Sequence, residues 1–353
     1  MTCKNIRVVI VDDSLVAREM LFQILSSDPE IEVVGTAGDG QAGVDMVAKL
    51  RPDLVTMDIH MPRMDGLDAV ESIMAYTPTP VLVVSSSVHG EGLGGAFEAL
   101  AAGALEVMKK PEPKDWEDLE RIGREIIRKV KLLSRVKVIT HIRGRKRAGS
   151  SGVPVAPPAT PPSSKAVISL VAIGSSTGGP SALMTLLSAL PKGFPVPVLI
   201  AQHIADGFIP GLVEWLDGGC TIKVLSAGDG QSIDAGTAYL APTGSNLEFD
   251  GHRTHFTAPK PGQLYIPSAD TLFGSVAKAI RGQAVGVILT GMGNDGARGL
   301  KAMHDAGAKT IGQDEATSTV YGMPRAAAEL GAVDRALPID RIGAAVVEYV
   351  AGA

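Results

Sequence analysis

The chain alternates short apolar runs with segments in which apolar residues recur at helical spacing. Four such runs fall in the first 110 residues, at 8–11, 54–57, 81–84 and 105–108. Short apolar runs bounded by polar residues are typical of buried strands, and buried strands that alternate with helices form open α/β sheets. The pattern therefore predicts that the chain begins with an α/β domain.

A break in composition follows this first domain. Helical periodicity fades near residue 137, and residues 141–165 hold five prolines among Gly, Ser and Ala. Such a segment cannot build a core, so we predict a linker that is partly extended and partly flexible. Its basic run at 143–147 is typical of a solvated tether, and docking on an acidic partner is the alternative.

Beyond the linker the alternation of strands and helices resumes, which predicts a second α/β domain. A length of 353 residues agrees with two domains. The apolar runs of this part of the chain lie at 167–173, 198–202 and 284–289. The predicted boundaries are residues 1–135 for the first domain, 136–165 for the linker and 166–353 for the second domain.

Three aspartates end two strands of the first domain. Asp12 and Asp13 follow the run at 8–11, and Asp58 follows the run at 54–57. Carboxylates delivered to one edge of a sheet repel one another, so such a cluster usually binds a hard cation. Oxygen ligands suit Mg²⁺, and a magnesium ion beside a spare carboxylate is equipped to move a phosphoryl group onto it.

Two later strands end in groups that suit the same chemistry. Ser85 could bond a phosphoryl oxygen, and an ammonium at Lys109 or Lys110 could neutralise it. With these residues, positions 6 to about 130 resemble a response-regulator receiver domain, which a partner histidine kinase phosphorylates on an aspartate. The resemblance implies the following roles: Asp58 as phospho-acceptor, Asp12 and Asp13 as the acidic Mg²⁺ pair, the backbone carbonyl of His60 as a further metal ligand, and Ser85 and Lys110 as the switch hydroxyl and lysine.

The second domain opens with a glycine-rich turn between a strand and a helical pattern. Residues 174–178 spell G-x-S-x-G with Ser176 at the centre, the local context of a nucleophile elbow. The glycines permit a tight turn, and the start of the helix offers free N–H groups to a developing oxyanion. A glycine-rich loop at this place can also cradle a phosphate, so the loop alone leaves both interpretations open.

Two later strand ends favour catalysis. His203 follows the run at 198–202, and Asp295 lies in the loop after the run at 284–289. A serine hydroxyl needs a base, and the base needs a carboxylate that fixes its tautomer. Ser176, His203 and Asp295 supply these roles in an order along the chain that differs from that of α/β-hydrolases.

A second resemblance covers nearly the whole chain apart from the linker. A receiver, a Pro-rich linker, and the segments GSSTGGP, QHIADGF, APTGSN, PSADTLF and LTGMGNDGA together resemble the CheB-type chemotaxis receptor methylesterases. The resemblance implies a flavodoxin-like receiver joined to a Rossmann-like serine-hydrolase domain. It also implies hydrolysis of glutamate γ-methyl esters on methyl-accepting chemotaxis receptors, with release of methanol, and receptor glutamine deamidation. The reaction would need no cofactor, and Thr177 and Met292 would support the oxyanion or the geometry of the site.

Composition restricts the setting of the protein. A net charge of −5 disfavours nucleic acid or an anionic membrane as the main partner. Cys3 and Cys220, the two cysteines, have no metal-binding spacing and form no disulfide framework. No segment approaches the roughly 18 apolar residues of a membrane span, and the start of the chain leads into a strand instead of a signal-peptide core. We therefore expect a cytoplasmic protein without membrane insertion.

Other features are expected to be structural. His252 and His255 lie in a predicted hairpin, in which residues 247–249 and 255–256 flank the turn at 250–251, and a metal-binding histidine pair is the alternative. Trp116 and Trp215 are expected to pack between helices. A transcription factor would need a basic recognition helix, which residues 166–353 do not contain. A phosphate-binding output domain would have no use for His203 and Asp295, whereas a hydrolase of small esters stays open as an alternative.

Overall fold

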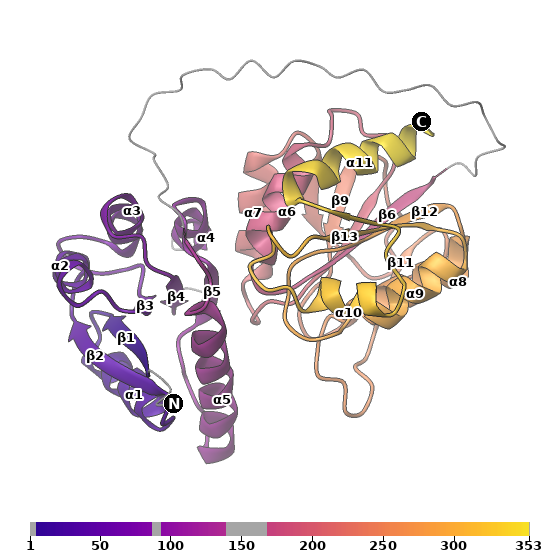
Figure 1. Cartoon of the computed structure of the whole chain (residues 1–353). Coiled ribbons are helices and arrows are strands. Elements are labelled where there is room, and N and C mark those ends of the chain that lie inside the picture. Colours follow the sequence, from indigo (N-terminus) through magenta and orange to yellow (C-terminus); the bar gives the residue numbers. More distant parts are fainter. Residues whose placement is uncertain (1–4, 87–92, 139–167, 353) are drawn as a thin grey trace, which may run out of the picture.

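The computed structural model describes residues 5–86, 93–138 and 168–352. These residues form two α/β domains, each built around its own parallel sheet (Figure 1). The predicted linker lies outside the described residues from residue 139 onward, and so does the basic run at 143–147.

In the first domain the described residues form a five-stranded sheet in the order β2-β1-β3-β4-β5, and every neighbouring pair is parallel. This is the flavodoxin-like order. The strands are β1 (Ile6–Val11), β2 (Ile31–Ala37), β3 (Leu54–Met57), β4 (Val81–Ser85) and β5 (Glu106–Lys109). The helices are α1 (Leu15–Ser26), α2 (Gly40–Leu50), α3 (Gly66–Tyr76), α4 (Leu93–Ala101) and α5 (Trp116–Leu133).

Side-chain alternation along β1 explains how this sheet is buried on both faces. Val8 and Ile10 pack with residues of α1 and α5, whereas Val9 and Val11 pack with residues of α2, α3 and α4. The predicted runs are therefore continuous because helices cover both sides of the sheet. The carboxyl ends of β1 and β3 are neighbours, which brings Asp12, Asp13 and Asp58 to one edge.

In the second domain the described residues form a seven-stranded parallel sheet in the order β14-β13-β12-β6-β7-β9-β8. Its strands are β6 (Leu170–Ser175), β7 (Val198–Gln202), β8 (Lys223–Ser226), β9 (Thr237–Leu240), β12 (Ala284–Ile288), β13 (Lys309–Gln313) and β14 (Arg335–Leu337). The antiparallel pair β10 (Asn246–Phe249) and β11 (Thr254–Thr257) is the hairpin expected around His252 and His255. The helices are α6 (Gly179–Ser188), α7 (Ile209–Gly219), α8 (Ala269–Ile280), α9 (Ala297–Asp305), α10 (Met323–Glu329) and α11 (Ile339–Ala351).

The strand order of the second domain creates a switch point between β6 and β12. The chain moves outward from β6 through β7 to β8 and β9, and then returns to β12 on the other side of β6. Open α/β sheets bind their ligands at the carboxyl ends of the strands that flank such a point. Helices α6, α7 and α11 cover one face of the sheet, and α8, α9 and α10 cover the other (Figure 1).

The two domains meet through α4 of the first domain and α7 of the second domain. The Phe97 ring on α4 is fully buried, with its centroid 5.9 Å from that of Trp215 and 6.3 Å from that of Phe208. Trp215 therefore packs between helices as expected. The expectation for Trp116 is wrong, because it is the first residue of α5 and its side chain is 71% exposed, with Nε1 donating to Glu120.

Candidate functional site

The acidic cluster of the first domain forms as the sequence predicts. Asp12 and Asp58 are buried and Asp13 is exposed, and one carboxylate oxygen from each lies within 4.8 Å of the others. Lys110 Nζ lies 2.8 Å from Asp12 Oδ2 and 2.9 Å from Asp58 Oδ2. Ser85 is fully buried at the end of β4, and its carbonyl accepts a hydrogen bond from the Lys110 N–H at 2.9 Å.

The electrostatics of this cluster suit a divalent cation. Burial raises the pKa of Asp58, and the neighbouring Asp12 adds to the rise, while Lys110 opposes it. One ammonium cannot balance three converging carboxylates, and the donor set consists of the hard oxygens that Mg²⁺ prefers. His60 lies two residues beyond Asp58 in the loop after β3, so its carbonyl belongs to the same edge of the sheet.

The predicted nucleophile loop, residues 174–178, is fixed between β6 and β12. Ser176 follows β6 directly, and its N–H donates to the Thr290 carbonyl at 3.0 Å. The Thr290 hydroxyl donates in turn to the Thr177 carbonyl at 2.9 Å. Gly178 adopts a left-handed conformation with φ of 74° just before α6, as a tight turn between strand and helix requires. The strand, turn and helix of a nucleophile elbow are therefore all present.

Gln202 joins the serine loop to the histidine loop, and no local pattern in the sequence distinguishes it from other polar residues at strand ends. Its side chain is 1% exposed, and Nε2 donates to the carbonyl oxygens of Ser176 at 2.9 Å and His203 at 2.7 Å. Its Oε1 accepts from the Ser175 hydroxyl at 2.6 Å. A Cβ at Gly179 would collide with this amide, so the second glycine of the Gly-Gly pair makes room for Gln202.

His203 and Asp295 form the expected pair. His203 Nε2 lies 2.9 Å from Asp295 Oδ2, and the two side chains are 10% and 7% exposed. The other ring nitrogen, Nδ1, is buried and has no hydrogen-bond partner among the described residues. If Nε2 carries the proton that Asp295 accepts, Nδ1 keeps the lone pair of a general base.

Asp295 is held by the start of α8 as well as by His203. Its Oδ1 accepts from the Ser268 hydroxyl at 2.8 Å and the Asp270 N–H at 3.2 Å, and Oδ2 accepts from the Ala269 N–H at 2.6 Å. Burial raises the pKa of this carboxyl, but the bond and charge of His203 together with Ser268 and Ala269 outweigh it, so the pKa is lowered. Asp295 is thereby kept ionised. Ser268, within the segment PSADTLF, is a second functional residue that sequence reasoning missed.

The loop that carries Met292 lies directly against Ser176. A Cβ at Gly291 would stand 2.7 Å from Ser176 Cβ, so only glycine permits this approach. Met292 is half-buried next to it, and Thr177 is 5% exposed on the serine side. The structure therefore brings Thr177 and Met292 to the same place as Ser176, although neither forms part of the His203–Asp295 pair.

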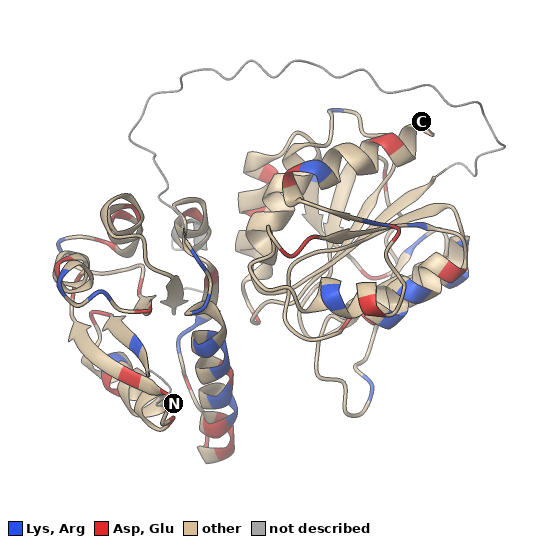
Figure 2. Ribbon diagram, viewed as in Figure 1, with Lys and Arg blue, Asp and Glu red and all other residues tan. Residues whose placement is uncertain are grey.

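The first domain reaches the loop of Thr177 and Gly178 through one buried carboxyl group. Glu106, the first residue of β5, is 5% exposed and lies 3.7 Å from Lys129 Nζ on α5, a helix on which basic and acidic residues are interspersed (Figure 2). Burial raises the pKa of Glu106, while Lys129, the Thr177 hydroxyl and the Gly178 N–H oppose the rise. Thr177 and Gly178 are thus close polar neighbours of Glu106, whose Oε2 makes no hydrogen bond within the described residues.

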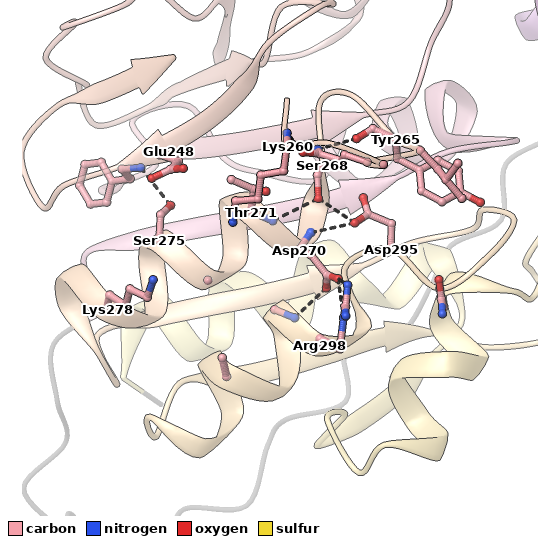
Figure 3. A pocket seen from close by; sticks show the side chains of 18 of the residues that line it. Glu248, Lys260, Tyr265, Ser268, Asp270, Thr271, Ser275, Lys278, Asp295 and Arg298 are labelled. Atoms are coloured by element: carbon pink, nitrogen blue, oxygen red, sulfur yellow. Dashed lines mark hydrogen bonds and ion pairs between the residues drawn. The ribbon is translucent and has the colours of Figure 1, made fainter. Parts of the chain in front are cut away.

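An open groove of about 860 Å³ extends from Asp295 along α8 and α9 (Figure 3). Tyr265 and Lys260 line one side, and Lys278 and Arg298 line the helical side. Among the described residues, the acidic cluster of the receiver is the only group of three or more potential His, Cys, Asp or Glu metal ligands. His255 instead bonds Asp250 at 2.7 Å, as a structural hairpin residue does.

The chain matches two family models. Residues 171–346 match the CheB methylesterase model, and residues 8–119 match the response regulator receiver domain model. None of the helices in the described ranges is long and apolar enough to cross a membrane.

Whole-chain relatives carry a double name. The protein-glutamate methylesterase/protein-glutamine glutaminase 2 of Anaeromyxobacter dehalogenans is 43% identical, covering 98% of this chain and 97% of its own. The corresponding protein 4 of Geobacter metallireducens is 45% identical over 96% of both chains. Among solved structures, the CheB methylesterase catalytic domain of Thermotoga maritima is 34% identical, with a TM-score of 0.49, and the match covers 52% of this chain and 99% of that one.

Proposed function

Because the chain belongs to the family of receiver-containing CheB methylesterases, we propose that it hydrolyses glutamate γ-methyl esters on methyl-accepting chemotaxis receptors. The protein is a carboxylic ester hydrolase of the protein-glutamate methylesterase/protein-glutamine glutaminase class. The same site would convert receptor glutamines to glutamates, because an amide and an ester pass through the same acyl-enzyme. The first reaction releases methanol and the second releases ammonia.

We assign the chemistry to Ser176, His203 and Asp295. The Ser176 hydroxyl oxygen attacks the ester carbonyl while His203 Nδ1 takes its proton, which forms a tetrahedral oxyanion and an imidazolium. The imidazolium then returns the proton to the methoxide as the C–O bond breaks, so methanol leaves and a glutamyl-serine ester remains. Water, activated by the same nitrogen, hydrolyses this ester and restores the serine.

The observation that carries this proposal is the fixed His203–Asp295 pair beside a serine on the switch point. Asp295 is held ionised by three donors at the start of α8, and its bond to Nε2 leaves Nδ1 as the nitrogen that can act as base. A phosphate-binding loop would need neither the histidine nor the buried carboxylate. No cofactor takes part in these steps.

We further propose that the start of α6 stabilises the oxyanion. The Gly178 N–H stands at the end of the turn before α6, where the helix dipole favours negative charge. Thr177 and Met292 flank this position from the two sides of the switch point and would shape the pocket around the carbonyl. Glu106 of the receiver lies next to the Gly178 N–H and the Thr177 hydroxyl, so a docked receiver would compete with the developing oxyanion for these donors.

Phosphorylation of Asp58 is the proposed control. A chemotaxis histidine kinase would supply the phosphoryl group, and Mg²⁺ would be held by Asp12, Asp13, Asp58 and the His60 carbonyl. The ion would neutralise the phosphoryl oxygens during transfer. Ser85 and Lys110 would then move toward the new charge of about −1.5 to −2. We also propose a cytoplasmic location.

Strand β5 offers a direct route from this event to the catalytic loop. Lys110 follows its carboxyl end and contacts Asp58, and Glu106 stands at its amino end beside Thr177. A shift of β5 toward the phosphoryl group would therefore disturb the contact at the other end. The division into a receiver at 1–135, a linker at 136–165 and a catalytic domain at 166–353 is part of this proposal.

The test is methanol release from a methylated receptor, measured with and without the cognate kinase and ATP. We expect release that depends on Ser176 and rises when Asp58 is phosphorylated. Labelling of Ser176 by a fluorophosphonate probe separates catalysis from simple phosphate binding, because only an activated serine reacts. A Ser176→Ala protein that still releases methanol at most of the original rate would overturn the proposed function.

A further inference from the structure

We propose that Tyr265 is a positioning residue for the general base, holding the His203 imidazole in its productive orientation by stacking on its face. The ring centroids are 4.7 Å apart and the rings are within 9° of parallel. Tyr265 lies in the segment between β11 and α8, at the end of the groove near Asp295 (Figure 3). The inference rests on the proposed role of His203 as the base.

The stack supplies a constraint that Asp295 alone cannot supply. A single hydrogen bond from Nε2 to Asp295 fixes one corner of the imidazole but allows the ring to swing about that corner. Nδ1, on the other side of the ring, has no partner among the described residues that would stop this motion. A flat aromatic ring packed against one face of the imidazole prevents the imidazole from rotating toward that side. The plane of the imidazole ring, and with it the direction of Nδ1, therefore stays constant.

The position of Tyr265 is itself fixed, although its segment is on the surface. The neighbouring Leu264 is 87% exposed, yet the Tyr265 carbonyl accepts from Gln263 Nε2 at 2.8 Å. Gln263 in turn exchanges two side-chain bonds with Asn246, which is 1% exposed on β10. Asn246 Oδ1 also accepts from the Ser268 N–H at 3.0 Å. One buried amide therefore anchors both the tyrosine segment and the serine that holds Asp295.

Space for the phenol is also specific. Gly293, in the loop between Met292 and Asp295, has φ of 85°, and an added Cβ there would collide with the Tyr265 hydroxyl. The tyrosine thus lies between the imidazole and a glycine of the catalytic loop. The positive φ of Gly293 could also be adopted by asparagine. The closeness of the Tyr265 hydroxyl explains why this position is a glycine.

The stack should assist the chemical step more than it assists binding. When His203 takes the serine proton it becomes a cation, and the face of a tyrosine attracts a cation that is shielded from water. The His203 side chain is 10% exposed, so water screens this attraction only in part. Loss of the aromatic face should therefore lower kcat by about 5- to 30-fold and leave KM nearly unchanged.

The experiment compares Tyr265→Phe, Tyr265→Leu and, as a matched control on the same segment, Leu264→Ala. All are made in the full-length chain, phosphorylated by the kinase with ATP. Phenylalanine keeps the face and removes the hydroxyl, whereas leucine keeps apolar bulk and removes the face. We expect Tyr265→Phe and Leu264→Ala to keep kcat within about 3-fold of the original value. Tyr265→Leu should show the whole decrease in kcat of about 5- to 30-fold, with an unchanged thermal unfolding midpoint.

A second measurement separates positioning from receptor binding, because Tyr265 also lines the groove. The rate at which a fluorophosphonate labels Ser176 depends on the activated serine but not on a bound receptor. Tyr265→Leu should slow this labelling by the same factor as methanol release. Gln263→Ala, which releases the segment that carries Tyr265 but leaves the tyrosine ring in place, should partly slow both the labelling and the methanol release. Unchanged labelling, or a Phe variant as damaged as Leu, would overturn the inference. Activity that survives His203→Ala would instead overturn the proposed function.

Discussion

Glu106→Ala should activate the unphosphorylated enzyme. Glu106 is buried against Thr177 and Gly178, so truncation removes two polar contacts and leaves a gap at the point where the receiver covers the nucleophile loop. Two contacts of imperfect geometry contribute together about 1–2 kcal/mol, which corresponds to a roughly 5- to 30-fold change in the ratio of open to closed molecules. If about 1% of the chain is open at the start, the variant would be about 5–25% open.

The assay is the initial rate of methanol release without phosphodonor, expressed as a fraction of the rate of the same protein when phosphorylated. Glu30→Ala is the matched control, because Glu30 is a receiver glutamate that pairs with Lys131 and is 58% exposed. If Glu106→Ala stayed as inhibited as the original chain, or if Glu30→Ala activated the enzyme equally, Glu106 would not be the contact that holds the receiver in place.

The pH dependence of inhibition sharpens this test. Burial raises the pKa of Glu106 in the docked arrangement above its ordinary value of 4.5. A raised pKa means that protonation of Glu106 favours docking. The contribution of the Glu106 carboxyl to docking is therefore complete below pH 4.5 and declines as the pH rises through the raised pKa of the docked arrangement. Inhibition should therefore weaken with rising pH. Glu106→Gln, which stays neutral and keeps an acceptor for Gly178, should remain inhibited and lose this pH dependence.

Outcomes are also expected for five substitutions at the two sites. Ser176→Ala should abolish methanol release while Asp58 still accepts phosphate, and His203→Ala should lose activity on the order of 10⁴-fold in the same assay. Asp58→Asn should incorporate no phosphoryl group from kinase, ATP and Mg²⁺, and a stable label on a serine or histidine would contradict the assignment. Ser268→Ala should lower the free energy of unfolding by about 1 kcal/mol in calorimetry, because it removes the α8 cap and a donor to Asp295. Since the pKa of Asp295 is lowered, its stabilisation is present above its ordinary value of 3.8 and is lost as the pH falls below that value, so Asp295→Asn should flatten the acid limb of the stability curve.

Sequence reasoning predicted the parts of this protein that local patterns determine. Apolar runs predicted the strands, although β6 begins at Leu170, after residues 168–169 of the expected run, and residue 167 lies outside the described residues. The parallel sheets follow from the alternation of strands and helices, and the residues at strand ends follow from the rule that such sheets gather them at one edge. For this reason Asp12, Asp58, Ser176 and His203 could be selected before any contact was known.

What the sequence could not provide were contacts between distant segments. Gln202 ends a strand like many polar residues, and only the fold reveals that its amide joins two catalytic loops. Glu106 is an ordinary strand residue until the second domain is placed against it. Trp116 was misjudged because a large aromatic residue in a helical pattern is usually buried, whereas at the first position of α5 it projects beyond the core.

The bond between Asp295 and the start of α8 affects how relatives of this protein should be interpreted. Backbone N–H groups at a helix start need acceptors, and this carboxylate accepts from two of them as well as from Ser268. A descendant that lost its esterase activity would still be under selection to keep the aspartate for stability. Retention of Asp295 is therefore weak evidence that a relative is an active enzyme, whereas loss of Ser176 or His203, which cap no helix, would identify a pseudoenzyme.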